Sequence, residues 1–75
     1  MNTVNCNVYD VKEGFKFKIN STPNVNLLNS LGVFPGVVFT KKYNVKFGGP
    51  AIILIGTRMV AISKNIAQLI DSSAI

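Results

Sequence analysis

The stretch LNSLGVFPGVVF, residues 28–39, holds three residues that shape the backbone: Gly32, Pro35 and Gly36. Gly32 fits the left-handed position that ends a helix, after which Val33 can fold back onto that helix. Pro35-Gly36 fits a tight turn in which the glycine takes the positive φ angle. The stretch therefore predicts a rigid corner between a helix and a strand.

The helix expected before this corner occupies the segment STPNVNLLNSLG, residues 21–32. We expect Thr22 to be its N-cap and Pro23 to take the first helical position, where a missing N–H costs nothing. Apolar side chains recur at helical spacing and form one stripe: Val25, Leu27, Leu28 and Leu31. The asparagines around this stripe are weak helix formers, so packing must hold the helix.

Alternating apolar and polar residues predict strands on both sides of this helix. The expected inward row of residues 15–20 is Phe15, Phe17 and Ile19. The expected inward row of residues 37–47 is Val37, Phe39, Tyr43, Val45 and Phe47. Lys41 interrupts the second row, which predicts a bulge or strong bend near Lys41–Lys42. Further strands are expected at residues 51–55, at residues 59–62 and through residues 69–70.

Turn residues separate these strands. Residues 8–14 are expected to form a short turn of helix or a loop closed by Gly14. Gly48-Gly49 marks a reversal, and Pro50 begins a strand without needing to donate to a ladder. A second reversal is expected at residues 56–58. Ser63 is the expected cap of a last helical turn, to which four residues give apolar contacts: Ile66, Ala67, Leu69 and Ile70.

About five short strands with one short inserted helix make the chain mainly β. Short antiparallel strands must curl to bury one face and protect their edges, which favours a small, partly open SH3-like barrel. A five-stranded OB-like barrel is the alternative, although it usually has longer strands. We expect one domain at residues 8–75 and a loose leader at residues 1–7, with Cys6 as a free thiol on the leader.

The composition argues against an enzyme. The 75 residues contain no histidine, one cysteine and three acids, Asp10, Glu13 and Asp71. A catalytic triad would lack its histidine base, and a structural zinc site would lack its ligands. Asp10 and Glu13 are expected in a solvated loop beside Gly14. We therefore predict no catalytic residue, no cofactor and no tight iron site in this chain alone.

The chain is basic, with a formal net charge of +5. Four lysines occupy outward positions of the expected strands: Lys16, Lys18, Lys42 and Lys46. They fit a solvated surface or, alternatively, a barrel that binds nucleic acid. Nucleic-acid barrels stack bases on outward aromatic rings, and the pattern leaves only Tyr9 and Phe34 free for this.

Two sets of residues are candidates for contact with a partner protein. The first is the corner of Val33, Phe34 and Pro35, because an aromatic side chain on a rigid corner is a good anchor. The second is the outward pair Ile52 and Leu54. Either the helix or the C-terminal tail covers this pair, or it forms an exposed apolar strip for docking or self-association.

Three segments together resemble the FeoA family of small ferrous-iron transport proteins: SLGVFPGVVF (30–39), FGGPAIILI (47–55) and GTRMVAIS with NIAQLI (56–70). The opening VYDVKEG (8–14) is similar to the usual start of that family. The strongest mark is Leu31-Gly32-Val33-x-Pro35-Gly36, followed about a dozen residues later by Gly48-Gly49-Pro50. The outward Ile52 and Leu54 and the position of Thr57 depart from the family pattern.

The resemblance implies an SH3-like accessory protein of ferrous-iron uptake. Its implied partner is a FeoB-type permease with a cytosolic G-protein domain, reached by protein contact rather than catalysis. The implied location is the cytoplasm, with the membrane reached only through the partner. Arg58, at a hairpin tip, is either a solvated turn residue or a side chain that reaches a nucleotide phosphate of that partner.

Overall fold

The structure is a computed structural model that describes residues 5–75. In this part of the chain it contains six strands and two short helices: β1 (Asn5–Asn7), β2 (Lys16–Ser21), α1 (Asn26–Ser30), β3 (Val38–Asn44), β4 (Ala51–Ile55), β5 (Arg58–Ile62), α2 (Lys64–Ala67) and β6 (Asp71–Ala74). The mainly β fold with a short helix inserted between the second and third strands is confirmed. The number of strands exceeds the expected five by one.

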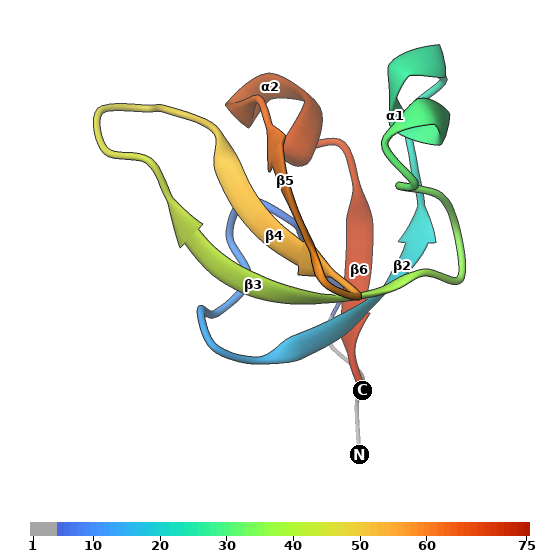
Figure 1. Cartoon of the computed structure of the whole chain (residues 1–75), viewed down its shortest axis with the longest axis horizontal. Coiled ribbons are helices and arrows are strands. Elements are labelled where there is room, and N and C mark those ends of the chain that lie inside the picture. Colours follow the sequence, from blue (N-terminus) through green and yellow to red (C-terminus); the bar gives the residue numbers. More distant parts are fainter. Residues whose placement is uncertain (1–4) are drawn as a thin grey trace.

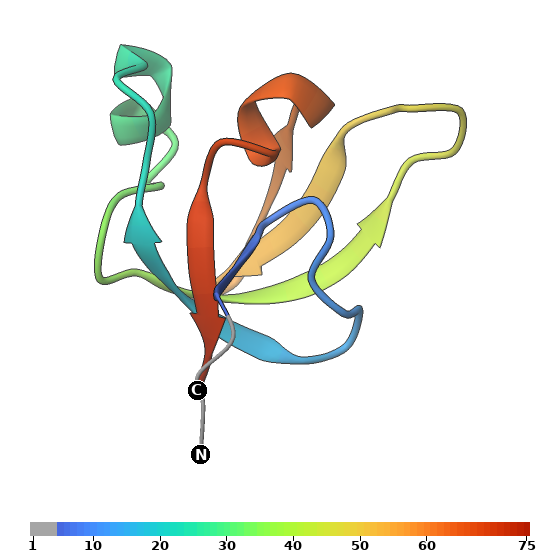
Figure 2. The same cartoon turned by 180° about the vertical axis from the view of Figure 1, so that it is seen from behind.

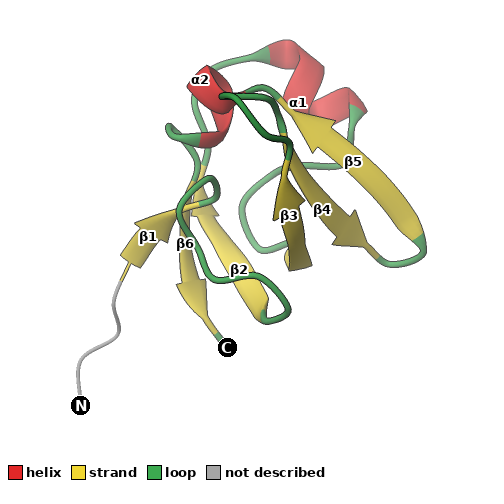
Figure 3. Ribbon diagram, turned by 90° about the vertical axis from the view of Figure 1, so that its left-hand side faces the viewer, coloured by secondary structure: helices red, strands yellow, loops and turns green. Residues whose placement is uncertain are grey.

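All six strands form one antiparallel sheet in the order β1-β6-β2-β3-β4-β5. The sheet curls into an open barrel whose unpaired edges are β1 and β5, and both helices lie at the same end of it (Figures 1 and 2). Viewed from the side, the helices cover this end and the C-terminus lies at the opposite end (Figure 3). The barrel is thus SH3-like and only partly closed, as expected.

The core fills the inside of this curl. Among the described residues, thirteen apolar side chains are buried: Val8, Val11, Phe17, Ile19, Leu28, Val33, Phe39, Ala51, Ile53, Val60, Ile62, Ala67 and Ile70. The rings of Phe17 and Phe39, directly opposite each other on β2 and β3, have centroids 5.7 Å apart. This aromatic pair joins the two strands that flank the helical insertion.

The predicted corner forms as a Schellman motif followed by a turn. The Val33 amide donates to the Leu28 carbonyl at 2.8 Å, and the Gly32 amide donates to Asn29 at 3.1 Å. Gly32 has a φ of 81°. The Val37 amide then donates to the Phe34 carbonyl at 3.2 Å across Pro35 and Gly36, whose φ is 95°. A positive φ of the third turn residue is what a type II turn requires.

The helix begins later than predicted. α1 starts at Asn26, its N-cap is Val25, and no side chain caps it, so Thr22 and Pro23 lie outside the helix. Val25 has an extended backbone and its amide donates to the Pro23 carbonyl at 2.8 Å. Because asparagines favour helix weakly, only the turn that packs on the core becomes helical. Leu28 is buried there, while Leu27 is exposed.

The ends of the chain were predicted least well. Residues 5–7 are not part of a loose leader, because they form β1 and pair with β6, while residues 1–4 lie outside the described part. Cys6 is partly buried against the core, and its carbonyl accepts a 2.8 Å bond from the Ser72 hydroxyl. The last strand begins at Asp71, not at residues 69–70. Leu69 stays exposed, and Ser63 precedes α2 without a side-chain cap bond.

The bulge predicted in the third strand exists, and it lies between Lys41 and Tyr43. Its effect on the register was not predicted. Lys41, opposite Ile53, is buried, whereas Tyr43, opposite Ile52, is exposed. One extra residue reverses the alternation beyond it, because strand side chains have a period of two. Three side chains that lie beyond the bulge and were expected inside are consequently exposed: Tyr43, Val45 and Phe47. Phe15, which precedes β2, was also expected inside and is exposed.

The turns lie where the glycines predicted them. The Val45 amide donates to the Pro50 carbonyl at 2.8 Å and closes the β3–β4 hairpin. A two-residue turn at Gly56-Thr57 joins β4 to β5, with Ile55 opposite Arg58. Positive φ angles occur at four of the glycines named as turn residues, Gly14, Gly32, Gly36 and Gly48. Gly49 instead lies against Val45, where a Cβ atom would come within 2.6 Å of the valine Cβ.

Candidate functional site

The outward side chains of β2, β3, β4 and β5 form one surface, which we call the outer sheet face. One row across it follows directly from the pairing: Lys16 lies opposite Thr40, Thr40 opposite Leu54, and Leu54 opposite Met59. A second row joins Tyr43, Ile52 and Ala61. Alternation along each strand places the core residues on the other side of the sheet.

This face is unusually apolar for an exposed surface. Val38, Tyr43 and Met59 are 45%, 47% and 54% exposed, respectively. Ile52 and Leu54 are outward, as predicted, and half-buried. Neighbouring exposed apolar side chains of this kind mark interaction sites on soluble domains more often than isolated ones do. The outer sheet face is therefore the candidate docking surface of the chain.

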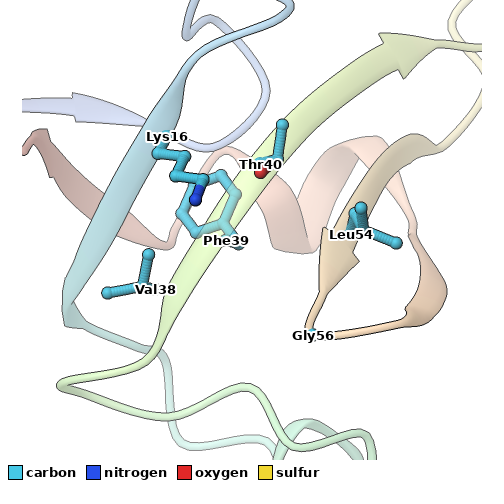
Figure 4. Close-up of a pocket in the computed structure, with 6 residues that line it drawn as sticks. All are labelled: Lys16, Val38, Phe39, Thr40, Leu54 and Gly56. Carbon is cyan, nitrogen blue, oxygen red and sulfur yellow. The ribbon is translucent and has the colours of Figure 1, made fainter.

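A groove indents this surface where β3 and β4 separate. Their ladder ends at the pair Thr40–Leu54, and beyond it the start of β3 faces the tip of the β4–β5 hairpin. The groove has a volume of about 220 Å³. Figure 4 shows the residues that line it: Lys16, Val38, Phe39, Thr40, Leu54 and Gly56.

The charges of the outer sheet face have one sign. Strands β2 to β5 carry Lys16, Lys18, Lys41, Lys42 and Arg58 but no aspartate or glutamate. Four of these cations are exposed, as predicted for the outward lysines, and only Lys41 is buried. The three acids of the chain lie in the loop before β2 and on β6. An approaching partner therefore meets positive charge around an apolar centre.

The corner that carries Phe34 is a second exposed feature. Phe34 is 46% exposed and Pro35 is also exposed, as predicted. Val33 is fully buried, so its expected place on a partner surface is wrong. The Schellman motif explains this, because it folds the residue after the glycine back onto the helix. Phe34 is left as the apolar anchor of the corner.

Arg58 has a structural partner within the chain. Its Nη2 donates a 3.0 Å hydrogen bond to the Leu31 carbonyl, which ends α1. A cation at the C-terminal end of a helix satisfies a free carbonyl and interacts favourably with the helix dipole. The arginine thus ties the β4–β5 hairpin to the corner, although the side chain remains exposed.

The buried Lys41 is the most unusual polar group, and sequence reasoning missed its role. Its Nζ donates to the carbonyls of Val8 and Tyr9 at 2.8 Å and to that of Val11 at 3.4 Å. Burial lowers the pKa of Lys41, while the negative charges of Glu13 and Asp10 oppose that shift. The side chain fastens the loop before β2 to the barrel. The available signal for this role was the lysine itself, at a position that the strand alternation places on the inward face.

Asn44 supports the same loop. Its Nδ2 donates to the Tyr9 carbonyl at 2.9 Å, while its buried Oδ1 has no hydrogen-bond partner in the structure. The Tyr9 hydroxyl donates to the Gly49 carbonyl at 3.2 Å. Tyr9 is partly buried against the core, so it is not the freely exposed ring that we expected.

Metal ligands do not cluster in residues 5–75. No group of three or more histidine, cysteine, aspartate or glutamate side chains could hold an ion there. Asp10 lies in the loop before β2, where its carboxylate accepts a 2.9 Å bond from Asn7. In the same described part, no helix is both long and apolar enough to cross a membrane.

The fold and its exposed face define the class: a small SH3-like β domain with a candidate docking surface. The chain belongs to the FeoA family, whose domain matches residues 6–73. This family is one of small, non-catalytic accessory domains, and membership supports a role in ferrous-iron transport. The resemblance inferred from the corner and turn residues is confirmed.

Solved structures confirm the fold. A crystal structure of an iron uptake regulatory protein, FeoA, has a TM-score of 0.84 at 23% identity and covers 96% of this chain and 99% of its own. Iron(II) transport protein A from Clostridium thermocellum has a TM-score of 0.82 at 22% identity, covering 92% and 45%. A manganese-dependent transcriptional repressor has a TM-score of 0.85 at 12% identity, covering 100% and 44%. The chain thus spans less than half of the last two proteins. No curated protein matches it.

Proposed function

We propose that the chain is an accessory protein of ferrous-iron uptake that acts by binding a FeoB-type permease. The contact regulates or assembles the permease and involves no catalysis by this chain. It places the chain in the cytoplasm, at the inner face of the membrane that holds its partner. Family membership supplies the link to ferrous iron, and the apolar, basic outer sheet face supports the contact.

The outer sheet face carries this proposal. Side chains as large as Val38, Tyr43 and Met59 gain about 25 cal/mol for each Å² of apolar surface that a partner removes from water. The surrounding lysines provide the polar rim that protein interfaces commonly have. Phe34, on its rigid corner, adds an aromatic anchor whose backbone needs no reordering on binding.

Co-purification tests the proposal. The tagged chain and a FeoB-type permease from the same genome are co-expressed and extracted in mild detergent, and ferrous-iron uptake is measured in the same cells. We expect the wild-type chain to retain the permease. Leu54→Ser and Phe34→Ala should each reduce both retention and uptake. Leu69→Ser removes an equally apolar side chain, 63% exposed and outside the outer sheet face, and should change neither.

Two results of this experiment would contradict the proposal. A chain that folds normally but does not retain the permease under any condition, with uptake independent of its presence, contradicts the proposed function. Retention that is unchanged by Leu54→Ser but lost in Leu69→Ser contradicts the assignment of the surface. If GTP hydrolysis by the permease changes on addition of the chain, and Arg58→Ala abolishes that change, the contact acts on nucleotide turnover.

Nucleic-acid binding is the second candidate, and one observation favours it. Some of the aromatic rings that were expected in the core are exposed, and one of them, Tyr43, lies on the outer sheet face with exposed lysines. Exposed rings beside positive charge are the usual means of binding single strands. A titration with a labelled oligonucleotide decides between the two, because micromolar, salt-sensitive binding at physiological salt would support the nucleic-acid barrel.

A further inference from the structure

The groove at the end of the β3–β4 ladder has the size of a site for one side chain. Its volume of about 220 Å³ lies below the roughly 300–1,000 Å³ of typical small-molecule pockets. Leu54 and Val38 give it aliphatic walls, and Gly56 leaves its end without a side chain. A cofactor or drug-sized ligand does not fit such a space, whereas a single apolar side chain of a partner does.

Positively charged side chains line one side of the groove in a regular row. Lys16 lies opposite Thr40 and Lys18 lies opposite Val38, so two lysines follow the β2 side of the groove at successive outward positions. Both are exposed, and strands β2 to β5 carry no acid. The one acid of the neighbouring β6, Asp71, lies opposite Ser21 and accepts a hydrogen bond from Asn20. Lysines in this arrangement favour a carboxylate that reaches the groove together with the apolar side chain.

The lysines and the side chains that line the groove disfavour two other ligands, a second copy of this chain and a nucleic acid. A second copy docking face to face through a two-fold axis that passes beside the groove would bring its own Lys16 and Lys18 against the same two lysines, which is repulsive. A nucleic-acid base would need an exposed ring to stack on, but the one aromatic residue of the groove, Phe39, is 1% exposed. An acidic protein segment meets neither obstacle.

We propose that this groove binds a short acidic segment of a partner protein, with an aliphatic side chain between β3 and the hairpin tip and carboxylates on Lys16 and Lys18. The inference rests on the proposed function only in that the permease is the natural owner of such a segment. The binding chemistry itself belongs to this chain and is testable without the permease.

Three synthetic peptides of about ten residues test the chemistry with the full-length, ¹⁵N-labelled chain. The first has one leucine flanked by glutamates, the second has glutamines in place of the glutamates, and the third has serine in place of the leucine. We expect the first to produce saturable shifts of the Thr40, Leu54 and Gly56 amides. The second and third should bind at least about tenfold more weakly, equivalent to about 1.4 kcal/mol each.

Substitutions in the chain test where the peptide binds. Lys16→Gln should lower the affinity for the first peptide about threefold, as expected for one exposed charge. Val38→Ser should lower it about tenfold, because it removes a wall of the groove without emptying the core. Lys46→Gln is the matched control, since this lysine lies in the turn beyond the far end of β3, and it should leave the affinity unchanged. The amide spectrum of each variant verifies its fold.

Other outcomes overturn the inference or separate it from the proposed function. Equal binding of the glutamate and glutamine peptides, or shifts centred on Phe34 instead of Thr40, overturns it. An oligothymidylate that shifts the same amides with similar affinity shows a general polyanion site, and shifts that depend on protein concentration alone show self-association. If Lys16→Gln with Val38→Ser abolishes peptide binding but the permease is still retained, the assignment of the acidic segment to the permease fails, while the groove chemistry and the proposed function both stand. If the peptide binds and the permease is not retained, the proposed function fails instead.

Discussion

Lys41 donates a 2.8 Å hydrogen bond to the carbonyl oxygen of Val8, although the two residues are 33 positions apart and both are fully buried. The same amine reaches Tyr9 and Val11, so one cation satisfies three carbonyls of the loop before β2. A buried cation is very costly unless its hydrogen bonds are made, and each buried carbonyl left without a donor adds a smaller cost. The loop and the bulge of β3 therefore depend on each other.

Replacement of Lys41 by methionine should destabilise the chain. Methionine matches the length of the side chain but leaves the Val8 carbonyl without its donor, at about 1–3 kcal/mol for a buried group, while the Tyr9 carbonyl keeps its bond from Asn44. Removal of the buried charge offsets part of this, so we expect a net loss of about 1–2 kcal/mol in urea unfolding. Lys42→Met, next in the chain and exposed, is the control and should change stability by less than about 0.5 kcal/mol. A Lys41→Met chain as stable as wild type contradicts this reasoning.

The pH dependence of stability offers an independent test of the same group. The pKa of Lys41 in the folded chain is lowered from its ordinary 10.5, chiefly by burial. Between the two values the unfolded chain binds more protons, so the free energy of unfolding rises with pH in that window. The difference between wild type and Lys41→Met should therefore grow in favour of wild type as the pH rises toward 10.5. A difference that shrinks over this range would show that the loop carbonyls, Asp10 and Glu13 hold the amine charged.

The corner at Gly32 was predictable because its chemistry is local. A left-handed residue after a helix and a proline–glycine turn are dictated by the residues that adopt them, whatever they pack against. The two faces of β4, with Ala51 and Ile53 inward and Ile52 and Leu54 outward, were predictable for a similar reason, since a regular strand alternates strictly. In each case the information lies within a few positions of the feature.

The parts that could not be predicted depend on distant partners. The interruption of the apolar row located the bulge. It did not predict that Lys41 turns inward, because the three carbonyls that accept hydrogen bonds from this lysine belong to residues 8–11. The reversal of register that exposes Tyr43 follows from that choice. β1 and β6 have mostly polar sequences, NCN and DSSA, and form through pairing with each other and with β2. Neither segment has the alternation of apolar and polar residues that predicts a strand.

Gly32 is constrained twice, by its backbone and by its neighbour. Its φ is 81°, and a Cβ atom there would lie 2.6 Å from the Arg58 Nη2. Gly36, with a φ of 95° and open space around its Cβ position, has the first constraint alone. Each glycine-to-alanine change should cost about 1–2 kcal/mol for the left-handed conformation. Gly32→Ala should cost roughly 0.5–1.5 kcal/mol more, because Arg58 must give up its bond to Leu31.

A double-mutant cycle isolates the second constraint. In an Arg58→Ala background the cost of Gly32→Ala, measured by urea unfolding, should fall to that of Gly36→Ala. The coupling energy between Gly32 and Arg58 should then equal the excess seen in the single variant. Additive effects of the two changes would show instead that the arginine moves aside without loss, and that its bond to the Leu31 carbonyl contributes nothing to stability.

Phe47 combines a strained backbone with a side chain that contacts little. Its φ is 63° and it is fully exposed at the tip of the β3–β4 hairpin. A bulky residue in the left-handed region costs about 1–2 kcal/mol, whereas asparagine tolerates that region well. Phe47→Asn should therefore raise the free energy of unfolding by about 0.5–1 kcal/mol. Phe34→Asn, where φ is not positive, should give no such gain. Unchanged or lower stability of Phe47→Asn would mean that the ring makes stabilising contacts that offset the strain.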